Sequence, residues 1–273
     1  MDDFDTDVLV AGAGPTGLTL ACVLAQWGVR VRVVDAAPAP PRGSRAKGLQ
    51  PRSLEVLDGL GLAGRLVARG RFRMPLRRYT EVGDRVGVLH EMHVGVEASP
   101  DRPWARTLLV PQWRVEEALR LRLAELGVAV EQGRAVVAAA QDLDDGGAVT
   151  VGLADGTTIT ARYLVGCDGG SSAVRRLLGV PFLGETREDV RMLLADVVLD
   201  GLDRDHWHQF GDARRRRFAM LCPLPSTDVF QLQAAVPPGR EDGEPTLPLL
   251  QEVVDAVTTG VRLREVAWAS RRA

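Results

Sequence analysis

The sequence has few of the residues that build metal sites and disulfide frameworks. Its 273 residues include three cysteines and four histidines. Cys22, Cys167 and Cys222 show no CxxC or Cys/His ligand spacing, so we expect small buried thiols in a reducing, cytoplasmic setting. The histidines form HxxH and HxH pairs without a cluster of further ligands, so no metal site is predicted.

Long apolar runs and an excess of either charge are also absent. No stretch approaches the roughly 20 apolar residues that cross a bilayer, and the acidic N-terminus is unlike a signal peptide. The formal net charge is -2, so neither a nucleic-acid nor an anionic-membrane partner is predicted. The arginine run at 214–217 is interpreted as a solvated turn. Lys47 is the only lysine.

The pattern of apolar residues predicts two kinds of region. The first begins with a strand at 8–11, a helix at 16–27 and a strand at 29–35, which together form a βαβ unit. Further helices are expected at 52–61, 112–127 and 172–178. A β-meander is expected at 135–139, 148–153 and 157–161, followed by a buried strand at 163–167. Beyond 181 the chain is mostly β, with strands at 192–199, 217–222, 229–236 and 263–269 and a helix at 247–258.

A glycine-rich turn joins the first strand to the first helix. Gly12 allows the turn, Gly14 allows close approach of a pyrophosphate, and Gly17 allows close packing of helix and strand. The helix N-terminus offers N–H groups to phosphates. Asp35 ends the second strand, where a carboxylate can accept hydrogen bonds from ribose and repel a 2′-phosphate. This predicts FAD or NAD rather than NADP. The residues assigned to this site are Gly12, Gly14, Pro15, Thr16, Gly17 and Asp35.

A second motif spans 163–175, where a strand runs into Asp168 and Gly169 before a short helix. A hydroxyl N-cap is expected at Ser171 or Ser172. A carboxylate at the carboxyl end of a strand faces the crevice in which α/β proteins bind ligands. A structural turn with a capped helix is the alternative interpretation.

Together, these motifs make the chain resemble the class A FAD-dependent aromatic hydroxylases. These are the para-hydroxybenzoate hydroxylase type, and the chain is most similar to the branch that tailors polyketides. The resemblance covers 7–18, 44–57, 110–112 and the Asp168 segment, and it extends to 223–225.

The resemblance implies roles for four further positions. Arg45 is similar to the arginine that contacts the flavin phosphate and ribityl region, and Gln112 to the glutamine that hydrogen-bonds the ribityl chain. Asp168, with Gly169, is similar to the aspartate that serves both the FAD ribose and the NAD(P)H path. No residue is assigned as a catalytic acid or base. Trp207, Phe210, Phe218 and Met220 either line a substrate cavity or belong to the core.

The implied fold class is α/β: a three-layer, Rossmann-like FAD-binding domain with an inserted β-meander, plus a second, sheet-rich substrate domain. We assign 1–72 and 107–180 to the first domain and 73–106 and 181–273 to the second. The family completes its FAD domain with a Gly-Asp segment that we do not find, so we expect an incomplete, C-terminally truncated domain with weak FAD affinity. A second polypeptide that completes the domain would restore it.

The family reaction is the hydroxylation of a phenolic or polyketide aromatic compound through a flavin C4a-hydroperoxide, with NAD(P)H as cosubstrate. One alternative is a non-catalytic fragment, an interaction module or one half of a split flavoprotein. A second is an NAD-dependent dehydrogenase, although no Tyr-x-x-x-Lys arrangement is present. A third is a flavin halogenase or reductase, although the halogenase Trp-x-Trp-x-Ile-Pro signature is absent.

Overall fold

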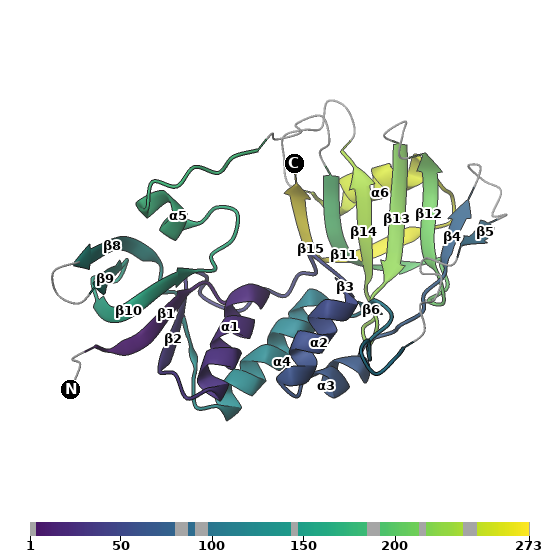
Figure 1. The fold of residues 1–273 in the computed structure, drawn as a ribbon. Coiled ribbons are helices and arrows are strands. Elements are labelled where there is room, and N and C mark those ends of the chain that lie inside the picture. The colour runs from purple at the N-terminus through teal and green to yellow at the C-terminus, as the bar shows by residue number, and fades with distance from the viewer. Residues whose placement is uncertain are drawn as a thin grey trace. The chain divides into compact units, whose positions relative to one another are not determined.

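The computed structural model describes residues 4–79, 87–90, 98–142, 147–184, 192–212, 217–236 and 245–272. The chain forms two compact units, each assembled from three segments (Figure 1). Unit 1 comprises Met1–Pro41, Leu57–Gly64 and Arg114–Gly184. Unit 2 comprises Arg42–Val56, Arg65–Trp113 and Glu185–Ala273. The predicted assignment of 1–72 and 107–180 to a cofactor domain and of the rest to a substrate domain stays a prediction.

Unit 1 is built on a six-stranded sheet in the order β7-β2-β1-β10-β9-β8. The strands are β1 (Thr6–Ala11), β2 (Val31–Asp35), β7 (Val130–Gln132), β8 (Val136–Asp142), β9 (Ala148–Leu153) and β10 (Thr158–Gly166). Neighbours from β7 to β10 are parallel, whereas β10, β9 and β8 pair antiparallel. The predicted βαβ unit and Rossmann-like fold class are confirmed.

Strand β10 replaces two predicted elements. The sequence suggested a meander strand at 157–161 and a separate buried strand at 163–167, whereas one continuous strand covers both. Its first half pairs antiparallel with β9, and from Ala161 onward it runs parallel to β1. Arg162 lies within the strand, and its guanidinium is 3.5 Å from the carboxylate of Asp7. The meander is therefore an extension of the parallel sheet.

The first helices along the chain are α1 (Pro15–Gln26), α2 (Pro51–Gly59), α3 (Ala63–Val67), α4 (Gln112–Glu125) and α5 (Ala173–Leu177). Four of these helices begin close to their predicted positions, whereas α3 was not predicted. Pro15 occupies the first turn of α1, where a missing N–H costs no helical hydrogen bond. Ser172 caps α5, and its Oγ accepts a hydrogen bond from Arg175 N at 2.9 Å. Of the two N-cap candidates, the structure selects Ser172.

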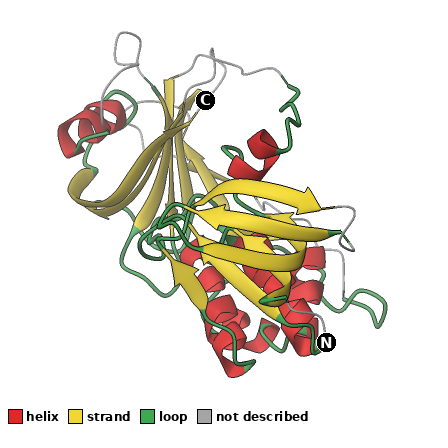
Figure 2. Ribbon diagram, turned by 90° about the vertical axis from the view of Figure 1, so that its left-hand side faces the viewer, coloured by secondary structure: helices red, strands yellow, loops and turns green. Residues whose placement is uncertain are grey.

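Unit 2 is built on a seven-stranded sheet in the order β15-β11-β14-β13-β12-β4-β5 (Figure 2). Its strands are β4 (Leu76–Tyr79), β5 (Gly87–His90), β11 (Met192–Asp200), β12 (Trp207–Asp212), β13 (Arg217–Pro223), β14 (Phe230–Ala235) and β15 (Arg262–Arg272). All neighbours are antiparallel except β4 and β12. A two-stranded sheet joins β3 (Gly48–Leu49) to β6 (Leu108–Leu109).

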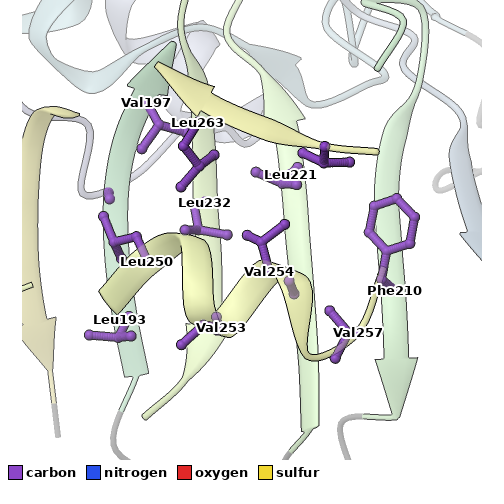
Figure 3. Close-up of a cluster of buried hydrophobic side chains, with 14 of the residues drawn as sticks. Leu193, Val197, Phe210, Leu221, Leu232, Leu250, Val253, Val254, Val257 and Leu263 are labelled. Atoms are coloured by element: carbon purple, nitrogen blue, oxygen red, sulfur yellow. The ribbon is translucent and has the colours of Figure 1, made fainter. Parts of the chain in front are cut away.

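Helix α6 (Leu247–Asp255) covers one face of the seven-stranded sheet and forms the core of unit 2 with it (Figure 3). Leu250, Val253 and Val254 pack against strand residues that include Leu193 and Leu232. Because strand side chains alternate between faces, the neighbouring residues of β11, β13 and β14 lie on the face opposite α6. In the described parts of the chain, no helix has the length and apolar character of a bilayer-crossing segment.

Candidate functional site

The glycine-rich turn of unit 1 brings three backbone segments together. Gly12 has φ of +105°, and an added Cβ would lie 2.5 Å from the carbonyl oxygen of Cys167. At Gly17 an added Cβ would lie 1.9 Å from the carbonyl oxygen of Gly12. Both positions therefore require glycine. Gly14 differs, because its φ of −74° suits any residue and an added Cβ would meet no atom within 4 Å.

The space beside Gly14 lies at the N-terminus of α1, which no side chain caps. The first N–H groups of a helix have no partner within the helix and carry its positive dipole end. Pro15 is half-buried and Thr16 is exposed at this end. A phosphate group fits such a cradle, since the backbone supplies donors and glycine leaves room.

Asp35 lies at the end of β2 and holds the turn in place. Its Oδ2 accepts a hydrogen bond from Ala13 N at 2.6 Å, and its Oδ1 accepts one from Ala37 N at 2.8 Å. A carboxylate has about four acceptor positions, so two bonds leave capacity for a ribose hydroxyl. The structure thus adds a positioning role to the predicted ligand role.

Helix α4 supplies a contact to the turn that the sequence analysis missed. Arg120 donates to the carbonyl oxygen of Ala13 at 3.5 Å and lies 3.3 Å from the carboxylate of Glu116. Glu116 is 2% exposed, so the pair is largely removed from water. An i,i+4 pair on a helix carries no sequence signal for contact with a turn more than 100 residues away.

Asp168 lies where β10 gives way to α5. Its Oδ2 accepts hydrogen bonds from Ala173 N at 2.6 Å and Val174 N at 3.2 Å. Burial acts to raise the pKa of this carboxyl, but hydrogen bonds from Ser172 and the two amides outweigh it and leave the pKa lowered. The Oδ1 atom is buried without a partner. Gly169 follows with φ of +78°.

The contacts of Asp168 fit both interpretations of the second motif, the structural turn and the ligand-binding carboxylate. The amide bonds are those of the structural turn that was the alternative. The unpartnered Oδ1 leaves an acceptor for a ligand hydroxyl, since buried polar atoms normally have a partner. With the open cradle at Gly14, these features of unit 1 fit an ADP-containing dinucleotide.

Arg45 and Gln112 both lie in unit 2. Gln112 N donates to the Ala46 carbonyl oxygen at 3.1 Å, and Ala46 N donates to Gln112 Oε1 at 3.2 Å. Gln112 thus fixes the loop that carries Arg45, whose side chain is exposed. The structure links these two predicted residues through the hydrogen bonds of Ala46, one to the backbone and one to the side chain of Gln112.

A buried polar cluster, which the sequence analysis did not predict, occupies the face of the unit 2 sheet opposite α6. Lys47 donates to Gln231 Oε1 at 2.6 Å, and its Nζ lies 4.2 Å from the centre of the Trp207 ring. Asp196 Oδ2 accepts from Ser44 N at 2.8 Å. We call this set, Ser44, Lys47, Asp196, Trp207 and Gln231, the polar cluster.

Burial shifts the acid–base equilibria of the polar cluster. It lowers the pKa of Lys47, against the opposing charges of Cys222 and Asp196. It raises the pKa of Asp196 to about 6, although hydrogen bonds from Ser44 and the charge of Lys47 act to lower it. It also raises the pKa of the Cys222 thiol to about 12, against the charges of Lys47 and Arg204.

The four candidate cavity residues separate into two groups. Phe210 belongs to the core under α6, whereas Phe218 is buried outside that cluster and shares the face of Met220 on β13. Trp207 and Met220 are half-buried. Among the described residues, no group of three or more His, Cys, Asp and Glu side chains is arranged to hold a metal ion. His93 and Arg214 to Arg216 lie outside the described residues.

Comparison with known proteins identifies relatives of nearly the whole chain. The family described as "FAD binding domain" matches residues 5–266. A flavin-dependent monooxygenase of Mycobacteroides abscessus is 40% identical over 272 residues, covering 96% of this chain and 56% of the relative. The chain spans about half the length of the curated relatives it matches.

Two solved structures show the same fold over about half of their own lengths. An anhydrotetracycline hydroxylase from Streptomyces rimosus is 32% identical, with a TM-score of 0.71, over 97% of this chain and 52% of its own. An aklavinone-11 hydroxylase in complex with FAD and aklavinone is 25% identical, with a TM-score of 0.80, over 99% of this chain and 55% of its own.

Proposed function

This chain belongs to the FAD-binding domain family of the flavin-dependent monooxygenases, and on that premise we propose that it binds FAD and contributes to aromatic hydroxylation. The reaction would use NAD(P)H and O2 and act on a phenolic or polyketide aromatic compound. The similar anhydrotetracycline hydroxylase and aklavinone-11 hydroxylase support this substrate class. Because the relatives are about twice as long, the activity is proposed rather than transferred.

In unit 1 the residues that would hold FAD are those of the glycine turn and the two carboxylates. Backbone N–H groups at Thr16 and Gly17 would face the pyrophosphate, and Gly14 leaves it room. Asp35 and Asp168 each retain acceptor capacity for ribose hydroxyls. These groups of unit 1 would bind and orient FAD, so none of them is assigned as a catalytic acid or base.

In unit 2 the proposed contacts to the cofactor are Arg45 and Gln112. The exposed guanidinium of Arg45 suits a phosphate, which it can contact with two parallel hydrogen bonds. Gln112 anchors the loop of Arg45, and its side-chain amide is the type of group that hydrogen-bonds a ribityl hydroxyl. Bound FAD supplies the redox chemistry, and the polypeptide orients the partners and excludes water.

The single observation that carries the proposal is the open space beside Gly14. A Gly14→Val variant should fold normally, since an added Cβ would meet no atom within 4 Å and the φ of −74° is allowed. It should bind FAD at least tenfold more weakly, because the side chain occupies the place of the pyrophosphate. Flavin fluorescence quenching during FAD titration measures the affinity, and circular dichroism checks the fold.

Gly64→Val is the matched control. Gly64 also has no atom within 4 Å of an added Cβ, but it lies in α3 outside the turn. If Gly14→Val and wild type bound FAD with equal affinity, the proposed FAD site at the glycine turn would be wrong. Saturable NAD⁺ binding with no FAD binding would instead favour the dehydrogenase alternative.

Three finer expectations remain proposals. An aromatic small molecule is the expected partner, and relatives solved with such ligands support it. A second polypeptide that completes the FAD domain would reveal itself as a gain in FAD affinity when it is added. A cytoplasmic location is tested by fractionation of the source cells.

A further inference from the structure

The polar cluster lies on a sheet face whose other side is apolar. Leu221 and Leu232 face α6, so the alternating residues Cys222 and Gln231 project from the opposite face. Asp196 is the register partner of Gln231, and Cys222 is its partner on the other strand. Three adjacent strands therefore place a carboxylate, an amide and a thiol in one buried row.

A loop of unit 2 closes over this row. The Ser44 carbonyl oxygen accepts a hydrogen bond from Gln231 Nε2, and Ser44 N donates to Asp196 Oδ2. Gly43 lies against the ring of Trp268, where an added Cβ would come within 2.1 Å of ring carbon. The loop is thus fixed at several points, and it delivers Lys47 to the sheet.

Lys47 has an unusual setting for an ammonium group. It is 7% exposed, and among the ion pairs of the described residues none includes it. Only one of its three N–H donors has a hydrogen bond in the described structure, to Gln231. A buried charge that forms no ion pair is unfavourable, because its loss of hydration is not offset by a direct counter-charge. An anionic ligand would offset that cost.

Other buried atoms in the cluster also have no partner. Asp196 Oδ1 and Trp207 Nε1 are both buried without a hydrogen bond, one as an acceptor and one as a donor. The next row on the same face is half-buried and consists of Gln209, Met220 and Gln233. This row offers amide groups and a flexible thioether, a surface that suits the plane of a large ring.

We propose that Lys47 is a specificity residue that binds the ionised hydroxyl oxygen of a planar aromatic substrate, a phenolate or an enolate. Trp207 Nε1 donates to a carbonyl oxygen of the same ligand, and Asp196 Oδ1 accepts from a second hydroxyl. The inference rests on the proposed function, since it names the substrate class of that reaction. An ionised hydroxyl also enriches the ring in electrons, as electrophilic hydroxylation requires.

The titratable groups that face Lys47 are Asp196 on β11 and Cys222 on β13, with Arg204 next to Cys222. The Cys222 thiol stays neutral near pH 7 because burial raises its pKa to about 12. Asp196 competes as an anion only above its raised pKa of about 6. Above that pKa Asp196 is itself an acceptor, so its Oδ1 is expected to bind a neutral hydroxyl, whereas the ionised hydroxyl oxygen is expected to bind the Lys47 ammonium group.

Alizarin, a 1,2-dihydroxyanthraquinone, is a suitable probe because its ionised form absorbs at longer wavelength. The full chain is titrated with alizarin over a series of pH values, with and without FAD. Wild type should bind the dye in its ionised form and lower its apparent pKa. Lys47→Met, which keeps the length of the side chain, should bind it about tenfold more weakly and abolish the shift.

Arg262→Met is the control, since it removes one exposed positive charge from β15 of the same unit. Lack of saturable binding by wild type, or a bound dye whose pKa is unchanged or raised, overturns the inference without any variant. An ionised dye that binds equally well to Lys47→Met also overturns it. FAD affinity is measured separately on the same samples. A chain that does not bind FAD would contradict the proposed function, whereas the dye titration tests the role of Lys47.

Discussion

At the scale of single residues, the two units differ in how far the sequence predicts them. Gly12 and Gly17 were predicted because their task is local: a turn and a helix meet within a few residues. The polar cluster was missed because Lys47 and Gln231 are 184 positions apart. A lone lysine in a loop and a lone aspartate in an apolar strand form no motif. Their meeting follows from tertiary packing.

Asp196 gives the folded chain a predictable dependence on pH. Burial raises the pKa of Asp196 from its ordinary value of 3.8 to about 6. Between these values the folded state holds a proton that the unfolded state lacks, so stability falls as pH rises through about 6. Asp196→Asn removes this dependence. The difference in unfolding free energy between wild type and variant should drop by about 2 kcal/mol from pH 4 to pH 7.

Urea denaturation at each pH measures this difference. Other carboxyls with lowered pKa values, such as Asp5 and Asp168, contribute equally to both proteins and cancel. A difference that stays constant or grows toward neutral pH would show that Asp196 is not protonated in the folded chain.

At the scale of elements, the sequence located helices better than strand limits. Gly14 and Pro15 mark the start of α1, and Pro51 marks the start of α2. Strand β12 was not predicted, because Trp207 to Phe210 alternates in a polar and aromatic stretch without β-branched residues. Its parallel partner β4 lies about 130 positions earlier. Pairing across that distance leaves no local pattern.

Helix α6 should contribute most of its stabilisation through the face that packs on the sheet. Leu250 is 0% exposed in the core of unit 2 (Figure 3). Leu250→Ala should therefore lower the free energy of unfolding by about 3 kcal/mol, through lost contacts and a residual cavity. Glu252→Ala, at an exposed position of the same helix, should change it by less than about 0.5 kcal/mol. Similar urea midpoints for both variants would show that α6 is not a structural support.

At the scale of the whole molecule, one segment of unit 1 keeps its apolar side chains in water. Leu178, Val180, Phe182 and Leu183 are 67%, 52%, 74% and 87% exposed. They follow one another within six positions, whereas exposed apolar residues are normally scattered. With a net charge of only -2, little electrostatic repulsion opposes association between chains.

We expect the purified chain to self-associate through this segment. Replacing Phe182 and Leu183 with serine should reduce light scattering and shift the chain toward monomer in sedimentation experiments. FAD affinity should stay the same, because neither residue belongs to the turn. Trp27→Ser is the control, since Trp27 is 77% exposed but isolated. If that control reduced scattering as much as the double variant, the segment would have no special role.

The burial of Lys47 also has a practical meaning for chemical labelling. Apart from the terminal amino group, Lys47 carries the only primary amine in the chain, and it is 7% exposed. An acylating reagent at neutral pH should therefore modify the N-terminus faster than Lys47. Acylation of Lys47, located by mass spectrometry, would report that reagents reach the polar cluster. The single lysine thus measures access to that face of the unit 2 sheet.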